Sequence, residues 1–368
     1  MKEKYSDKIY FLLVLAGCVA AIVGMLYKPQ AMSEAAKSGI DLCAEVMIPT
    51  LFPFFIVTAF LLRSSAIDFL GAKIERFSSR FLKTSGKAFA VFILSLFSGF
   101  PVGASLISNM TEEKKISKSE GSRLICCCVN AGPAFVISAV GHGMYGNRKL
   151  GIILFASLTL SAIIVFLISG EFTKKDLSCE EMIITKPELS SCLVASVSDA
   201  TKSIVSVCGW IVAFSCISTF LTEKAEALTM FFEVSLGCKK AAGYPLPVTA
   251  LIIGWGGLCV HCQVFHAVLK TGMKKINFFF FRMLNGALSA GICALILRFF
   301  PQSVQTFSAS SQAFGAGMSS NAVACAGLLL MCSIIIVDFE ENRNRKSQIS
   351  VKNKKRKNHK IIRKNEII

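Results

Sequence analysis

The feature that most constrains this chain is a series of long stretches with almost no charged residue. Several of them approach or exceed the roughly 20 apolar residues that an α-helix needs to cross about 30 Å of hydrocarbon. They lie at 9–27, 46–62, 88–110, 150–169, 204–221, 278–300 and 322–337. Because these stretches are apolar on every side, the sequence predicts an all-α polytopic membrane protein with about 8–10 transmembrane or re-entrant helices.

The charged residues are few and unevenly placed. They make up 17% of the 368 residues, against about a quarter in soluble domains. Basic residues crowd the loops at 63–87, 148–149 and 270–275, which predicts that these loops are cytoplasmic. The segment 171–188 is richer in acidic residues, and we expect it on the opposite side. The 15 cysteines fall mostly in apolar stretches, which indicates reduced thiols that pack between helices.

Two short strings indicate an internal repeat. AAKSGIDLC at 35–43 and ATKSIVSVC at 200–208 share Ala-x-Lys-Ser followed by Cys, and repeats are typical of transporters. We therefore expect an N-terminal transmembrane helix at 1–30, a first membrane repeat at 31–170, an extracytoplasmic linker at 171–195, a second membrane repeat at 196–337 and a basic, disordered cytoplasmic tail at 338–368. Such a tail is expected to contact anionic lipids of the bilayer rather than nucleic acid.

Three apolar stretches, at 88–110, 124–141 and 248–270, are interrupted by glycine or proline. Backbone polar groups freed in hydrocarbon cost several kcal/mol each unless protein, water or a ligand satisfies them. We therefore expect one shared substrate site near the middle of the bilayer. The candidate substrate-binding residues are Ser98, Gly99, Phe100, Pro101 and Gly103 at the first interruption, Asn130, Gly132 and Pro133 at the second, and Gly254, Trp255, Gly256, His261 and Gln263 at the third. The alternative is a set of kinks or close contacts in ordinary membrane helices.

Few side chains in these stretches suggest chemistry beyond binding. Glu233 either couples transport to a proton or cation or lies at an interfacial helix end. Cys259, His261, Cys262 and His266 match no standard zinc module, so we expect no metal site and no cofactor. The sequence has no zincin, nucleophile-elbow or phosphate-loop motif, and we do not expect an enzyme.

The strings around the interruptions resemble a known family. SGFPVGASLI at 98–107, CVNAGPAFVISAVG at 128–141 and GWGGLCVHCQV at 254–264 are similar to the YlbJ-type sporulation integral membrane proteins, within the wider group that carries nucleoside-recognition, or Gate, domains. The resemblance implies an architecture similar to concentrative nucleoside transporters. It also implies a role in moving dipicolinic acid across the outer forespore membrane of a spore-forming bacterium. Relatives are expected to carry lysine where this chain has Ser105, so a simple lysine–carboxylate contact is not expected there.

The implied substrate fits the interrupted helices. Dipicolinic acid is a small anionic molecule, a flat pyridine ring with two carboxylates. Helix N-termini after Gly99, Gly132 and Gly254 would supply N–H donors, and Phe100 and Trp255 would stack on the ring. Further donors are expected from Asn130, His261 and Gln263. The alternatives are a non-transporting sporulation membrane scaffold, whose tail recruits a soluble partner, and a nucleoside-type transporter.

Overall fold

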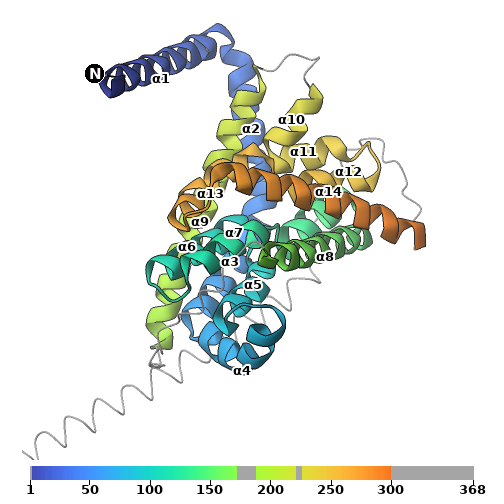
Figure 1. Cartoon of the computed structure of the whole chain (residues 1–368). Coiled ribbons are helices and arrows are strands. Elements are labelled where there is room, and N and C mark those ends of the chain that lie inside the picture. The colour runs from blue at the N-terminus through green and yellow to red at the C-terminus, as the bar shows by residue number, and fades with distance from the viewer. Residues whose placement is uncertain (1, 172–187, 221–225, 300–368) are drawn as a thin grey trace, which may run out of the picture.

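The computed structural model describes residues 2–171, 188–220 and 226–299 (Figure 1). The first half forms α1 (Lys2–Tyr27), α2 (Pro29–Leu42), the π-helical segment η1 (Cys43–Met47), α3 (Ile48–Arg63), α4 (Ala66–Phe81), α5 (Gly86–Ser98), α6 (Phe100–Glu112), α7 (Lys118–Cys128), the π-helical segment η2 (Ala134–Met144) and α8 (Arg148–Glu171). The second half forms α9 (Leu189–Ser218), α10 (Glu226–Phe232), α11 (Val234–Ala241), α12 (Leu246–Trp255), α13 (Gly257–Lys270) and α14 (Lys275–Phe299). Every regular element among the described residues is helical, so the all-α prediction is confirmed.

Five helical segments are long and apolar enough to cross a membrane. They are Pro29–Arg63, Arg148–Gly170, Leu189–Ser218, Leu246–Phe265 and Lys275–Phe299. The pair α4 and α5, bent by 104° at its break, supplies a sixth candidate. The polytopic membrane class is therefore confirmed, with five or six candidate spans among the described residues. The expected span at 9–27 forms a helix but is not one of these candidates, and the expected span at 322–337 lies outside the described residues.

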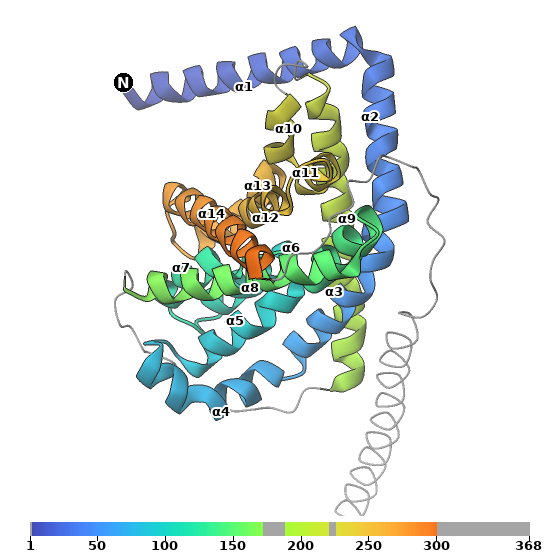
Figure 2. The ribbon, with the colours of Figure 1, turned by 90° about the vertical axis from the view of Figure 1, so that its right-hand side faces the viewer.

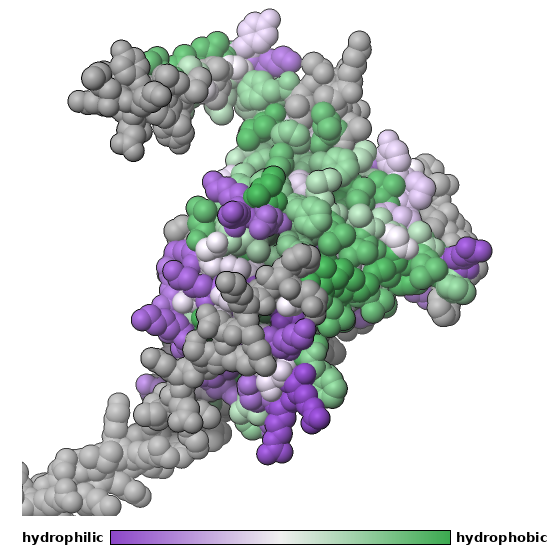
Figure 3. Space-filling view, viewed as in Figure 1, coloured by the Kyte–Doolittle hydropathy of each residue, from purple (hydrophilic) through white to green (hydrophobic). Residues whose placement is uncertain are grey.

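The two halves of the chain meet in the middle of the molecule. The continuous rod of α2, η1 and α3 stands beside α9 on one side of the bundle (Figure 2). On the other side α14 packs against both α12 and α8, and α13 packs against α6. Apolar residues gather over α8, α12 and α14 on the face shown in Figure 3, while hydrophilic residues gather near α4. This distribution is the one expected where lipid covers the middle of the bundle and water its end.

The rod and α9 run antiparallel and carry the two repeated strings. The carbonyl of Arg63 accepts a weak thiol bond from Cys192 at 3.6 Å, while the thiol of Cys43 lies 3.9 Å from the carbonyl oxygen of Cys208. Cys43 and Cys208 are the matching final residues of the two strings. The internal repeat stays a prediction, but its two copies are in direct contact.

The three predicted interruptions are confirmed as helix breaks. Gly99 separates α5 from α6 with φ 79° and ψ 171°, and Gly256 separates α12 from α13 with φ 88°. Residues 129–133 separate α7 from η2. Positive φ is costly for residues with a Cβ, so glycine is required at the first and last of these breaks. A fourth break lies at Glu233, which has an extended conformation between α10 and α11.

The two flanks of the acidic segment lie near the first half of the chain. Arg123 donates hydrogen bonds to the carbonyl of Leu82 at 2.8 Å and to that of Phe166, near the end of α8, at 3.0 Å. Cys192, in the first turn of α9, contacts Arg63. The extracytoplasmic linker at 171–195 stays a prediction.

Two further expectations lie outside the described residues. The segment 172–187 and the tail at 338–368 are not described. The cytoplasmic tail and its contact with anionic lipids stay predictions, as do the boundaries of the two repeats.

Candidate functional site

The first two helix breaks touch each other through glycine. A Cβ atom added to Gly132 would lie 2.7 Å from the carbonyl oxygen of Phe97 and 3.1 Å from the nitrogen of Gly99. The first distance is too short for any residue with a side chain, and the second is tighter than most Cβ contacts. The sequence thus permits backbone to cross backbone at this point, and the N-terminal ends of α6 and η2 are held side by side.

The other two breaks complete the crossing. A Cβ atom on Gly257 would lie 3.1 Å from the nitrogen of Val234 and 3.4 Å from the Cα atom of Glu233, so the third break packs on the fourth. A Cβ atom on Gly256 would lie 3.5 Å from the ring of Phe100. All four breaks therefore form one contiguous centre.

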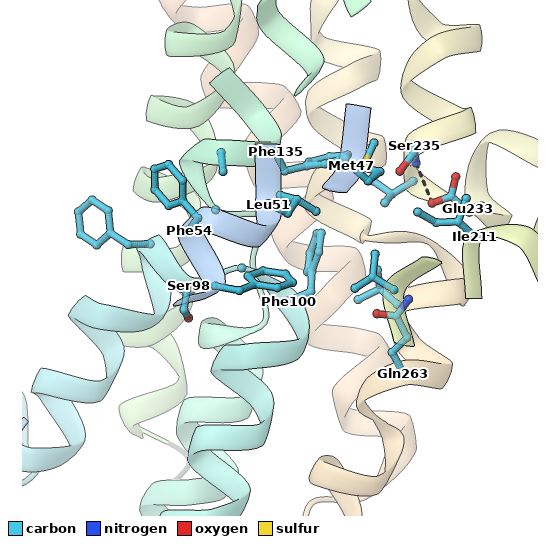
Figure 4. A pocket seen from close by; sticks show the side chains of 18 residues that line it. Met47, Leu51, Phe54, Ser98, Phe100, Phe135, Ile211, Glu233, Ser235 and Gln263 are labelled. Carbon is cyan, nitrogen blue, oxygen red and sulfur yellow. Dashed lines mark hydrogen bonds between the residues drawn. The ribbon is translucent and has the colours of Figure 1, made fainter. Parts of the chain in front are cut away.

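A small cavity lies at this centre (Figure 4). Its volume is about 50 Å³. Aromatic rings line much of it, together with aliphatic side chains of α3 and α9 and backbone from the breaks. The lining residues are Met47, Leu51, Phe54, Phe55, Phe97, Ser98, Gly99, Phe100, Gly132, Ala134, Phe135, Val207, Ile211, Glu233, Val234, Ser235, Val260 and Gln263.

Glu233 is the one ionisable side chain among the described residues that line the cavity. It is 2% exposed, and its carboxylate accepts hydrogen bonds from the backbone N–H groups of Ser235 at 2.9 Å and Leu236 at 2.7 Å. Figure 4 shows the first of these bonds. The carboxylate therefore caps α11 and meets the positive end of its dipole. Glu233 therefore lies at a helix end, as one alternative expected, and is buried in the protein. Its coupling role stays a prediction.

Six of the predicted residues line this cavity. They are Ser98, Gly99, Phe100, Gly132, Glu233 and Gln263. Phe100 presents its ring to the cavity, as expected of a residue that stacks on a flat substrate. The structure thus brings residues of the first, second and fourth breaks to one space, and Gln263 from α13 beside them.

Other predicted residues lie behind the cavity and hold the breaks. The ring centres of Trp255 and His261 lie 4.3 Å apart with their planes tilted by 37°, and the Nε1–H of Trp255 donates to the carbonyl of Phe231 at 3.1 Å. His261 Nδ1 is bonded to the carbonyl of Gly257 at 2.5 Å. Neither Trp255 nor His261 lines the small cavity, and their role in substrate binding stays a prediction.

The remaining predicted residues serve packing. A Cβ atom on Gly103 would lie 3.0 Å from the carbonyl oxygen of Cys128, and one on Gly254 would lie 2.7 Å from the Cα atom of Gly286. These glycines let helices approach closely, as the packing alternative expected. Asn130 is buried in a hydrogen-bond network described below, and Gly256 and Pro133 stand at the breaks without lining the cavity. Pro101 belongs to the first turn of α6, and its side chain is not described.

Sequence reasoning missed the polar centre behind the breaks. Arg282 of α14 is fully buried, and its guanidinium donates to the carbonyls of Val129, Gly254 and Trp255 and to Oδ1 of Asn130. Asn285 donates to the same Asn130 oxygen at 3.2 Å. The signal was available, because Arg282 is an arginine inside an apolar stretch, which is expensive and therefore informative.

A second, larger cavity lies on the other side of Phe55. Its volume is about 620 Å³, and we call it the vestibule. Its charged lining residues are Arg63, Asp68, Glu113, Lys115, Asp199 and Lys202. Ser105, the position where relatives are expected to carry lysine, lines the vestibule and not the small cavity. Phe55 lines both and is 3% exposed.

No metal centre is evident in the part of the chain that the structure describes. Within residues 2–171, 188–220 and 226–299 no group of three or more His, Cys, Asp and Glu side chains is placed to hold a metal ion. The side chain of His266 is not described. Cys259 instead accepts a bond from Gln263 at 3.4 Å.

Comparison with known proteins supports a membrane role. Residues 44–170 match the Gate family, described as nucleoside recognition. Over 341 residues the chain is 25% identical to "Sporulation integral membrane protein YlbJ" of Bacillus subtilis (strain 168), an alignment covering 79% of this chain and 83% of the relative. The chain resembles YlbJ along most of its length. No solved structure matches.

These matches confirm the resemblance to YlbJ-type proteins. The Gate match begins in η1 and ends in the last turns of α8, so it contains the breaks at Gly99 and 129–133. Together with the candidate spans, the similarity to YlbJ supports an integral membrane protein.

Proposed function

We propose that this chain is a membrane transporter of spore development that carries dipicolinic acid across the outer forespore membrane. The observation that supports it best is the cavity at the crossing of four helix breaks. Interrupted helices that meet at a cavity are the usual construction of a transporter's substrate site. The developmental role rests on the similarity to YlbJ, and the substrate is the one that this resemblance implies.

The chemistry of the cavity supports a flat ring with carboxylates. The first N–H groups of a helix lack intrahelical acceptors and form the positive end of its dipole. α6 begins at Phe100 and η2 at Ala134, and both residues line the cavity. Phe55, Phe100 and Phe135 add aromatic faces. Two helix N-termini would bind carboxylate oxygens while phenylalanine rings contact the pyridine.

The size of the cavity implies a change of shape on binding. A water molecule needs about 10–15 Å³ of such space, so a volume of about 50 Å³ holds a few waters. A pyridine dicarboxylate, with 12 non-hydrogen atoms, is larger than those few waters together. Binding therefore requires the helix breaks to separate, and such a movement is what alternating access supplies.

Glu233 favours a second candidate substrate. A carboxylate in the cavity opposes a dianion by like-charge repulsion in a poorly screened environment. Dipicolinate binding would then be accompanied by a proton or cation on Glu233, which is the coupling role expected from the sequence. A neutral nucleoside needs no such neutralisation, and the Gate match is to a nucleoside-recognition family. A nucleoside is therefore the second candidate.

A flux assay on protein reconstituted in vesicles tests these candidates. We expect uptake of labelled dipicolinate to respond to an imposed proton gradient, and we expect Glu233→Gln, which keeps the side chain's shape, to lose that response. Uridine uptake without dipicolinate uptake would favour the nucleoside reading. If neither compound moved and deletion of the tail at 338–368 impaired sporulation, the scaffold alternative would replace transport.

A further inference from the structure

Arg282 is the most unusual charged residue of the described chain. Its side chain is 0% exposed, and it lies in the first third of α14, one of the candidate spans. All three guanidinium nitrogens donate hydrogen bonds. Nε donates to the carbonyl of Trp255 at 3.3 Å, Nη1 to the carbonyl of Val129 and to Oδ1 of Asn130, and Nη2 to the carbonyl of Gly254.

The charge of Arg282 is compensated without a carboxylate. Among the described residues Arg282 forms no ion pair. Its backbone acceptors are instead the last carbonyls of two interrupted helices, because α7 ends at Cys128 and α12 ends at Trp255. A helix C-terminus is equivalent to roughly −0.5 of an elementary charge. Two such ends together come close to balancing one guanidinium.

Asparagine side chains extend the contact into a network. Asn285 Nδ2 donates to Oδ1 of Asn130 at 3.2 Å and to the carbonyl of Gly254 at 3.1 Å. Ser161 of α8 donates to Oδ1 of Asn285 at 2.8 Å. The second and third helix breaks are therefore tied to each other and to α8 and α14 through one arginine.

We propose that Arg282 is a positioning residue that clamps α7 and α12 end to end, and that it is not a ligand of the anionic substrate. It does not line the cavity. Arg282 influences the cavity through Gly256. A Cβ atom on Gly256 would lie 3.3 Å from Nη2 of Arg282 and 3.5 Å from the ring of Phe100, which lines the cavity. The role in transport rests on the proposed function, whereas the clamp rests on the hydrogen bonds alone.

Arg123 also donates hydrogen bonds to backbone carbonyls of two segments of the chain, away from the cavity, and it supplies a matched control. Its guanidinium donates to the carbonyl of Leu82, just after α4, and to that of Phe166 in the last turns of α8. Its guanidinium also lies 4.1 Å from the centre of the Phe166 ring. Arg123→Lys should therefore lower stability as Arg282→Lys does, without any effect on substrate affinity.

The first experiment is a double-mutant cycle on thermal stability in detergent. Arg282→Lys keeps the charge, but a compact ammonium on a flexible stem cannot span two helix ends. We expect Arg282→Lys and Asn130→Ala each to lower the melting temperature, and the double variant to lose clearly less than the sum. Additive losses would overturn the clamp. The cycle tests the clamp even if the wild type transports neither dipicolinate nor uridine, a result that would count against the proposed function alone.

The second experiment separates positioning from ligation. Competition by dipicolinate and by its uncharged diamide is measured for the wild type, Arg282→Lys and Arg123→Lys. We expect Arg282→Lys to weaken the apparent affinity for both compounds by about tenfold. The ratio of the two affinities should stay within about twofold of the wild-type ratio. We expect Arg123→Lys to change neither. If the affinity for dipicolinate relative to that for the diamide fell tenfold or more in Arg282→Lys, Arg282 would bind the carboxylates, and the proposal would be overturned.

Discussion

The two cavities differ in size, lining and charge, yet Phe55 of α3 lines both. The vestibule has a volume of about 620 Å³ and six charged residues in its wall, whereas the central cavity has about 50 Å³ and one. Phe55 is 3% exposed. We therefore expect its ring to limit passage from the vestibule to the helix breaks.

The charges of the vestibule also differ from Glu233 in their partners. Arg63 pairs with Asp199 at 2.5 Å and Lys115 with Glu113 at 2.5 Å, all in side chains that are at least one-third exposed. Such exposed pairs contribute about 0–1 kcal/mol to stability. Glu233, by contrast, is buried against backbone N–H groups. We therefore expect substitutions of the exposed charges in the vestibule to cost little stability, and a substitution of Glu233 to cost more.

The largest effect is expected from Gly132→Ala. The new Cβ atom would lie 2.7 Å from the carbonyl oxygen of Phe97, and backbone cannot yield as a flexible side chain does. Overpacking of this kind costs about 1–3 kcal/mol, and here it also separates the first two breaks. We expect a lower melting temperature in detergent and loss of most transport, because the donors of α6 and η2 move apart.

Gly291→Ala is the matched control for that variant. Gly291 lies in α14, and a Cβ atom there would meet nothing within 4 Å. Alanine in a helix is favoured over glycine by about 0.8–1 kcal/mol, so stability should be kept or raised. Equal damage from both substitutions would contradict the role assigned to the crossing of the breaks.

An intermediate effect is expected from Phe55→Ala, which should join the vestibule to the cavity. Ser98 is buried and lines the cavity, so Ser98→Cys serves as a probe. We expect a membrane-impermeant thiol reagent to label Cys at this position slowly, and at least about tenfold faster when Phe55→Ala is added. Labelling is read by mass spectrometry of the peptide that contains the probe.

Leu62→Ala is the control for the barrier, because Leu62 lines the vestibule alone. It should leave the labelling rate at Ser98→Cys unchanged. Rapid labelling of this probe with Phe55 intact would show that access to the cavity does not pass this ring.

The smallest effect is expected in the vestibule itself. Ser105 and Lys202 are exposed in its wall. Ser105→Cys should be labelled quickly with or without Phe55, and Lys202→Ala should alter transport by less than about twofold, as exposed charges contribute little. A loss of transport above tenfold in Lys202→Ala would mean that the vestibule binds substrate rather than merely admitting it.

The sequence was a good guide to the helix breaks, because their causes are local. Gly99 and Gly256 have backbone angles that glycine adopts easily, and such a residue is visible in any apolar stretch. The residues nearest these breaks, Phe100 and Ser98 among them, consequently line the cavity. The spans 150–169 and 278–300 were equally readable, since length and hydropathy suffice.

The rest of the site depends on contacts that no local pattern encodes. Met47, Leu51 and Ile211 line the cavity from stretches that have apolar residues on several faces, so their sequence does not mark the face that is inside. Arg282 meets Val129 across 153 positions of the chain. Trp255 was expected at the site because it adjoins a break, but its ring packs against His261 outside the cavity lining.

The position of Trp255 gives the molecule an optical reporter of its own. The chain has two tryptophans. Trp210 packs on Phe214 within α9 at 6.0 Å, whereas Trp255 closes α12 directly before Gly256 and is hydrogen-bonded to Phe231. In a Trp210→Phe background the emission spectrum would come from the third break alone. Opening of the centre could then be followed in real time by fluorescence, without any dye attached to the protein.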